Sequence, residues 1–147
     1  MTAHHTLAGP PATAPWPMQA LKAVAVLHVV ALLFQAVTAG MLLSSPGGRA
    51  LHLNSGIALG VIGLAHLVAA ILVWRPGGGS ARFVGPAAAL LLLTAVAAVL
   101  GLAHVTVPHV PLGVGMFGGG VVQLLRVLAA DGQGDGQAGR RSERGQT

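Results

Sequence analysis

Apolar residues dominate four stretches of this chain, and short polar segments separate them. The stretches cover about residues 18–43, 51–74, 83–104 and 107–128. Each is close to the roughly 20 residues that a helix needs to cross the hydrocarbon core of a bilayer. The pattern therefore predicts four membrane-spanning helices, which together form one domain over residues 18–128.

The connections between these stretches are short, and their length predicts how the helices run. The linkers cover residues 44–50, 75–82 and 105–108. Linkers of this length favour antiparallel neighbours, so the predicted fold is all-α, an up-down-up-down four-helix bundle in the membrane. Residues 1–17 are expected to form a flexible head. The polar segment 129–147 is expected to be a disordered tail, because it cannot bury enough apolar surface to fold.

Composition and charge agree with a membrane protein. Hydrophobic residues make up 54% of the 147 residues and charged residues only 7%, which leaves too little polar surface for a soluble domain. The net charge of +5 comes from loops and tails, and of the eight basic residues only Arg49 lies on the side opposite to both termini. Lys and Arg accumulate on the cytoplasmic side of membrane proteins. We therefore predict a multi-pass protein of the cell membrane with both termini cytoplasmic, in contact with the lipid bilayer and not with nucleic acid.

Missing residue types exclude several kinds of chemistry. The chain has no cysteine, which excludes disulfides, thiolate metal sites and covalently attached haem. No Asp or Glu lies in the four apolar stretches, so they hold no carboxylate dyad, carboxylate proton relay or hydrolase site. No catalytic constellation is recognised. A redox role would make the protein an electron-transfer protein, with histidine as its good nitrogen ligand.

The second and fourth stretches open with the same pattern, a histidine followed four residues later by a glycine, so the two predicted hairpins form a weak internal repeat. The pairs are His52 with Gly56 and His109 with Gly113. At about 100° per residue, each glycine lies within roughly 40° of its histidine, so each pair shares one helix face. We expect these two helices to stand side by side with both histidines near the outer surface. The glycines would either allow close helix packing or give clearance to a flat cofactor.

Two facing imidazoles at one depth are what a six-coordinate haem iron requires. The predicted iron ligands are therefore His52 and His109, with Arg49, three residues before His52, beside a haem propionate. A copper or zinc site on these histidines and His104 is a weaker alternative, because no carboxylate or thiolate completes its ligand shell.

A second polar group is predicted deeper in the membrane. His28 and His66 lie about 20 Å below the outer pair at ~1.5 Å of helix rise per residue. Gln35, seven residues after His28, is expected to join them. These residues would ligate a second haem, contact a proton or a quinone, or hydrogen-bond across helices as buried polar groups.

Short sequences at equivalent helix ends carry a resemblance to known proteins. They are Gln35-Ala-Val-Thr-Ala-Gly40, Leu51-His52-x3-Gly56 and Pro108-His109. Over about residues 20–128 the chain resembles small bacterial four-helix membrane proteins classed as a domain of unknown function. More distantly, it is similar to one half of haem A synthase and to b-type membrane cytochromes, whose four-helix bundles carry paired histidines. The resemblance implies haem ligation by His52 and His109. The Glu-x-x-His-Arg element of the synthase is missing, so the resemblance implies no enzyme activity.

Two functions are consistent with these features. The first is a cytochrome-like membrane protein that binds haem b and either transfers single electrons with a quinone or a redox membrane partner, or handles haem. The alternative is a non-enzymatic accessory subunit or small-molecule channel whose histidines are interhelical packing groups. The glycine-rich faces would also permit a homo-oligomer.

Overall fold

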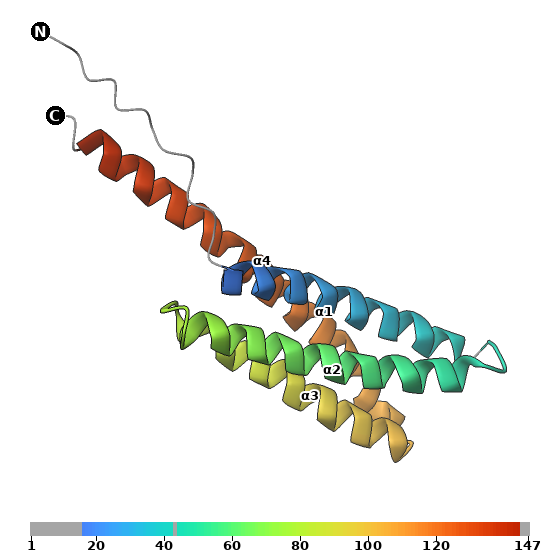
Figure 1. The fold of residues 1–147 in the computed structure, drawn as a ribbon. Coiled ribbons are helices and arrows are strands. Elements are labelled where there is room, and N and C mark those ends of the chain that lie inside the picture. The colour runs from blue at the N-terminus through green and yellow to red at the C-terminus, as the bar shows by residue number, and fades with distance from the viewer. Residues whose placement is uncertain (1–15, 43, 145–147) are drawn as a thin grey trace, which may run out of the picture.

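The computed structural model describes residues 16–42 and 44–144, with side chains up to residue 130. It contains four long helices: α1 (Trp16–Met41), α2 (Gly48–Trp74), α3 (Val84–Leu102) and α4 (Thr106–Arg144). A short 3-10 helix, η1 (Ala81–Phe83), precedes α3. The described part of the chain has no strand. The predicted all-α four-helix bundle is thus confirmed, with boundaries a few residues from those expected (Figure 1).

The helices form a ring in chain order. Extensive contacts join α1 with α2, α2 with α3, α3 with α4, and α4 with α1. The expectation that α2 and α4 stand side by side is therefore wrong, because an up-down bundle with short loops places alternate helices across its diagonals. We call the end that carries the start of α1 and the α2–α3 loop the inner end, after the predicted topology, and the opposite end the outer end.

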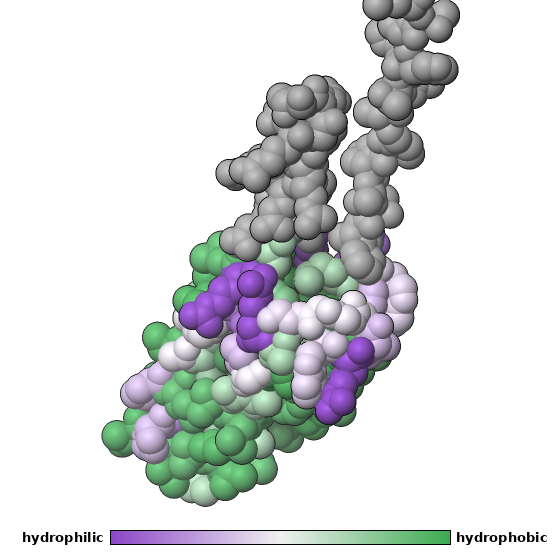
Figure 2. All heavy atoms as spheres, turned by 90° about the vertical axis from the view of Figure 1, so that its left-hand side faces the viewer, coloured by the Kyte–Doolittle hydropathy of each residue, from purple (hydrophilic) through white to green (hydrophobic). Residues whose placement is uncertain are grey.

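The bundle spans a membrane. Four segments are long and apolar enough to cross a bilayer: Trp16–Met41, Gly48–Trp74, Ala81–Leu102 and Thr106–Ala130. Many large apolar side chains point out of the bundle, as on α2, where Ile57 and Val61 are 61% and 65% exposed. Figure 2 shows the inner end, with hydrophilic residues gathered there and hydrophobic residues on the flanks. Such extended apolar flanks suit lipid and not water, so the chain is a multi-pass membrane protein.

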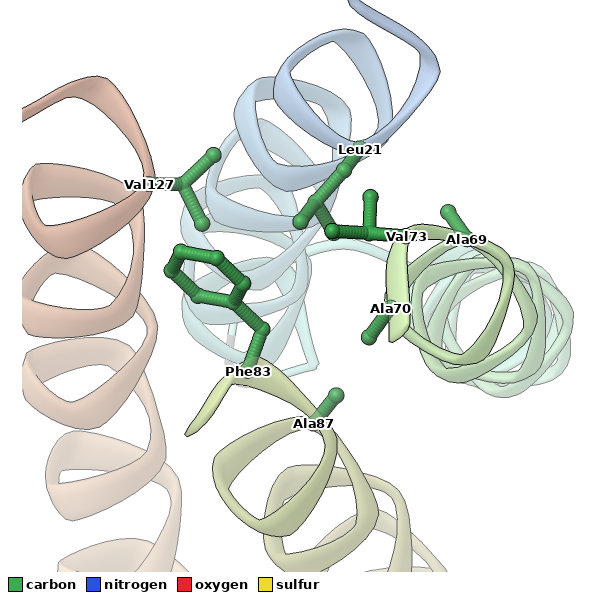
Figure 3. Close-up of a cluster of buried hydrophobic side chains, with 7 residues drawn as sticks. All are labelled: Leu21, Ala69, Ala70, Val73, Phe83, Ala87 and Val127. Atoms are coloured by element: carbon green, nitrogen blue, oxygen red, sulfur yellow. The ribbon is translucent and has the colours of Figure 1, made fainter. Parts of the chain in front are cut away.

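Two clusters of buried apolar side chains hold the helices together. The inner cluster consists of Leu21, Ala69, Ala70, Val73, Phe83, Ala87 and Val127 (Figure 3). The middle cluster consists of Leu32, Leu59, Leu90 and Met116. Lipid tails are as apolar as these side chains, so the clusters stabilise the bundle mainly by van der Waals packing. Phe83 is 2% exposed and fills the space between the helices near the inner end.

The backbone of α4 continues as helix to Arg144, well past the expected end at residue 128. It therefore runs through most of the segment expected to be disordered. Adding residues to a helix that already exists costs far less than starting one, and the chain has no proline after Pro111 to stop it. Residues 1–15 of the expected head and residues 145–147 of the tail lie outside the described residues.

The α1–α2 hairpin depends on a glycine. Gly48 is buried at the start of α2, and a Cβ atom there would collide with the backbone of Met41 and Leu42. We expect Gly48→Ala to destabilise the bundle by about 1–3 kcal/mol, as overpacking does elsewhere. Thermal unfolding in detergent measures this as a lower Tm. Gly47→Ala is the matched control, since a Cβ at Gly47 meets nothing within 4 Å, and an equal drop in both variants would contradict the prediction.

Candidate functional site

The two outer histidines meet across the diagonal of the bundle. Their ring centroids are 6.3 Å apart and the ring planes are inclined by 76°. His52 lies in the second turn of α2, and His109 lies in the first turn of α4. Both side chains are half-buried. The expected convergence of these histidines is therefore observed, although the helices that carry them are not neighbours.

The ring of His109 is oriented by the backbone of α3. Its Nδ1 lies 2.8 Å from the carbonyl oxygen of Ala97. A carbonyl only accepts hydrogen bonds, so Nδ1 carries the proton and donates it. In a neutral imidazole this leaves the lone pair on Nε2 free to bind a metal. Gly101, four residues after Ala97 on α3, also lies close to this ring: a Cβ atom there would be 3.1 Å from Cε1 of His109.

The ring of His52 is oriented by a fully buried hydroxyl of α1. Oγ1 of Thr38 lies 3.1 Å from Nδ1 of His52. This hydroxyl has two further acceptors for its single hydrogen, the backbone oxygen of Gln35 at 3.0 Å and Oγ of Ser55 at 3.0 Å. Donation to the backbone oxygen one turn earlier is the usual choice of a helical threonine. Thr38 then accepts from Nδ1–H of His52, which again leaves Nε2 unprotonated.

Gln35 closes this network. Its Oε1 accepts from the Ser55 hydroxyl at 2.5 Å, and its Nε2 donates to the backbone oxygen of His52 at 3.2 Å. The same Nε2 lies 3.2 and 3.3 Å from the two ring nitrogens of His52. A single atom cannot lie along both in-plane lone pairs, so the amide sits over the ring face, an N–H···π contact. We call Gln35, Thr38, His52 and Ser55 the outer polar network.

The expected grouping of Gln35 with the inner histidines is wrong. Seven residues of helix separate Gln35 from His28, about 10 Å of rise, so Gln35 reaches the level of His52 instead. His28 and His66 contact each other directly, with their Nδ1 atoms 2.9 Å apart. Nitrogens on opposite sides of one iron would be about 4 Å apart at ~2 Å each, so this contact leaves no space for a second haem.

The glycines of the repeat do not behave alike. Gly56 is half-buried, but the Gln35 amide already fills the space beside it, where a Cβ would be 3.2 Å from Nε2. Gly113 is exposed, and a Cβ there would meet nothing within 4 Å. Leu112, on the other side of His109 in the helical projection, packs against the middle cluster instead. The role of Gly113 in clearing space for a cofactor stays a prediction, and Gly101 of α3 is the glycine whose added Cβ would crowd the ring of His109.

The remaining predicted residues lie apart from the pair. Arg49 is exposed at the start of α2. His104 is also exposed and has φ of 57°, which places it at the left-handed position just after the end of α3. Among the described residues no three His, Cys, Asp or Glu side chains come together as metal ligands. The copper or zinc cluster on His52, His104 and His109 is thus not formed.

Packing differs sharply between the two ends of the bundle. In the described residues of the outer half, 33–58 and 95–115, only Thr38 and Gly48 are buried. The rest of the bundle contains both apolar clusters. A well-packed interior buries its apolar side chains, so the outer half is loosely packed by comparison. The histidine pair therefore lies in a part of the bundle that has no buried hydrophobic side chain of its own.

Thr38 and Ser55 were not singled out by the sequence analysis. Their signal is the spacing of polar residues in two apolar helices, Gln35 with Thr38 and His52 with Ser55, each three residues apart. Such pairs lie on one helix face, and the hairpin loop brings the two faces together. Ala97 gives no sequence signal, because its backbone carbonyl makes the contact.

Comparisons of the chain with models of protein families, with curated proteins and with solved structures give no match. The resemblance to small four-helix membrane proteins and to haem A synthase halves therefore stays a prediction. What the site can do follows from its own geometry.

Proposed function

We propose that this integral membrane protein binds one haem b between His52 and His109 near the outer end of the bundle. The observation that carries the proposal is the pair of imidazoles, 6.3 Å apart between ring centroids. Two imidazoles that ligate one metal ion through nitrogens at about 2 Å each have centroids about 6 Å apart. Both rings use Nδ1 for protein hydrogen bonds, so both keep Nε2 for the metal.

The donor set favours a haem over a simple metal ion. A zinc or copper site built from protein groups needs three or four ligands, whereas a haem brings four nitrogens and requires two axial ligands from the protein. The loosely packed outer half also supports this choice. A flat apolar group there would supply the buried contacts that residues 33–58 and 95–115 lack.

The protein's own residues would hold and orient the group. Thr38 and the Ala97 carbonyl fix the two ligand rings, which is how outer hydrogen bonds tune metal ligands in proteins. Arg49 lies three residues before His52 on the outer side and would pair with a propionate. When bound, haem b supplies one-electron redox chemistry. The protein would then exchange electrons with a quinone or a redox membrane partner, or deliver haem.

The direct test is a reduced-minus-oxidised absorption spectrum of the full-length protein, purified in detergent after expression with ample haem. We expect the sharp bands of a six-coordinate b-type haem, at about one haem per chain. A featureless spectrum, with protein that is folded by circular dichroism, would contradict the proposal.

The completeness of the outer polar network favours a second candidate. Three hydrogen bonds join α1 and α2 in this network: His52 donates to the Thr38 hydroxyl, Ser55 donates to the Gln35 amide oxygen, and the Gln35 amide donates to the backbone oxygen of His52. Hydrogen bonds of this kind hold membrane helices together without any ligand. In that case the protein is a non-enzymatic accessory subunit or small-molecule channel. A haem-free protein whose stability falls when His52 is replaced would favour this candidate.

The orienting role of Thr38 gives a further prediction. Thr38→Val keeps the shape of the side chain but removes the oxygen that accepts from His52. Loss of such an outer partner typically costs 10–100-fold in metal affinity, and we expect haem affinity to fall by that factor. Haem titration of the haem-free protein measures it. Thr38→Ser restores the hydroxyl and should restore affinity, whereas equal losses in both variants would show that packing and not the hydrogen bond matters.

A further inference from the structure

Three polar side chains are buried in the part of the bundle between the two apolar clusters; one of them, Gln123, donates to the backbone oxygen of Phe83 at 3.2 Å. His28, His66 and Gln123 are each 1% exposed and come from α1, α2 and α4. On its own helix, each lies between a member of the middle cluster and a member of the inner cluster. We call these residues the inner polar layer. Apolar side chains therefore separate the layer from the outer polar network and from the inner end of the bundle.

The two histidines of the layer share one proton between their facing nitrogens. Their Nδ1 atoms are 2.9 Å apart, and their rings meet edge to face at 82°. One Nδ1 must donate and the other must accept. In a neutral pair the donor ring then has a bare lone pair on Nε2, and the acceptor ring has N–H at Nε2.

None of these outward atoms has a partner. Nε2 of His28, Nε2 of His66 and Oε1 of Gln123 are all buried without a hydrogen bond. The ring of His28 lies beside Gly63, where an added Cβ would be 3.6 Å from Cε1 and 3.8 Å from Nε2. Unpaired polar atoms in an apolar interior cost more than a typical hydrogen bond returns. A purely structural cross-link would not need two histidines, so the layer has the features of a functional group in a membrane interior.

We propose that the His28–His66 pair is a proton-binding site that takes up one proton when the outer haem takes up one electron. The coupling rests on the proposed haem function. The proton comes from the aqueous phase outside the bundle and forms an N–H bond at the bare Nε2 of the donor ring. The Nδ1–H···Nδ1 bond remains and becomes charge-assisted, which strengthens it. The electron comes from the one-electron donor that reduces the haem, so the added positive and negative charges balance within the membrane.

The surroundings of the pair support this coupling. α3 has no titratable side chain, and α2 has only His52 and Arg49 besides His66. On α1 the other titratable residue is Lys22, six residues before His28. Within its membrane span, up to Ala130, α4 has Arg126, three residues after Gln123, and the distant His109; its remaining titratable residues, Asp131, Asp135, Arg140, Arg141, Glu143 and Arg144, come after that span in the sequence. No carboxylate lies in the four spans to stabilise a cation. A proton added to the layer is thus unfavourable until a negative charge is added nearby, and the electron taken up by the proposed haem would supply that charge.

The first experiment counts protons on the pair. Full-length protein with 15N-labelled histidine is studied by NMR in lipid nanodiscs, with signals assigned from the His28→Gln and His66→Gln variants. In haem-free protein we expect two N–H groups on the four ring nitrogens at neutral pH, and three after acidification with the fold retained. A pair that keeps two N–H groups until the protein unfolds would overturn proton binding. This result is independent of haem.

The second experiment tests the coupling. In haem-loaded protein at a pH where the oxidised form shows two N–H groups, we expect three after reduction. The reduction potential should fall as pH rises, and this pH dependence should shrink in the His28→Gln/His66→Gln double variant but not in His104→Gly. An unchanged count on reduction, or equal pH dependence in wild type and double variant, would overturn the coupling. A protein that binds no haem would overturn the proposed function while the count on acidification still decides proton binding.

Discussion

Replacing either His52 or His109 by alanine should abolish the sharp absorption bands of the reduced protein. Each residue would supply one nitrogen to the iron of the proposed haem, and the two ring centroids are 6.3 Å apart with their planes inclined by 76°. Loss of one ligand leaves a five-coordinate iron, changes the spectrum and weakens binding by more than the 10–100-fold expected for an outer partner. The measurement is the reduced-minus-oxidised spectrum together with the haem content per chain.

The matched control is His104→Gly. His104 lies only five residues before His109, but its side chain is exposed and its backbone is left-handed at φ 57°, a conformation in which glycine is favoured. This variant should keep the full spectrum. If it loses haem as the other two do, or if the alanine variants retain six-coordinate spectra, His52 and His109 are not the axial ligands.

The architecture could be predicted well because it depends on few physical requirements. Backbone groups in lipid must bond within their own segment, so four apolar stretches of about 20 residues become four helices. Short loops then fix their order. The prediction failed where it needed the positions of helices around the bundle axis. Equal histidine patterns on α2 and α4 suggested adjacent helices, but the loops place these helices on a diagonal.

The meeting of His52 and His109 was predictable, and the surroundings of the two rings were not. Histidine is conspicuous among apolar residues, and its position near a helix end gives its depth directly. The partners of each ring depend on rotations that periodicity does not resolve. Offsets of three and of four residues both lie near the same helix face, so periodicity did not show that Leu112, and not Gly113, packs against the middle cluster. The contact with the Ala97 carbonyl belongs to the backbone and leaves no trace in the residue types.

The inner polar layer and the outer polar network suggest why the bundle is packed unevenly. The inner polar layer is enclosed by both apolar clusters, which keep water away from a buried histidine pair. The outer polar network has the middle cluster on one side only, and the outer half beyond it is loosely packed. Tight packing is suited to a site whose partner is a proton, and loose packing to a site that admits a large flat ligand. The division of the chain into these halves is thus consistent with different ligands at the two depths.

A larger side chain at Gly101 should exclude haem although Gly101 is not a ligand. A Cβ atom there would lie 3.1 Å from Cε1 of His109, which is closer than most Cβ contacts, and 3.5 Å from its Nδ1, which is an ordinary contact distance. Gly101→Ala displaces the ring by a few tenths of an ångström and should weaken haem binding modestly. Gly101→Leu extends further into the same contact and would turn the ring away from the Ala97 carbonyl and from His52. We expect it to lower haem affinity at least 100-fold, comparable to the loss of a ligand.

Gly113 provides the matched control for Gly101. Gly113 shares the helix of His109 and matches Gly56 in the sequence pattern, yet a Cβ atom there meets nothing within 4 Å. Gly113→Leu should therefore leave haem binding unchanged, because the added side chain would point towards lipid. Haem titration and thermal unfolding of both leucine variants separate loss of the site from loss of the fold. If Gly113→Leu excludes haem and Gly101→Leu does not, the site lies on the glycine face of α4 that the sequence pattern suggested, and the ring of His109 does not rest on α3 in the haem-bound protein.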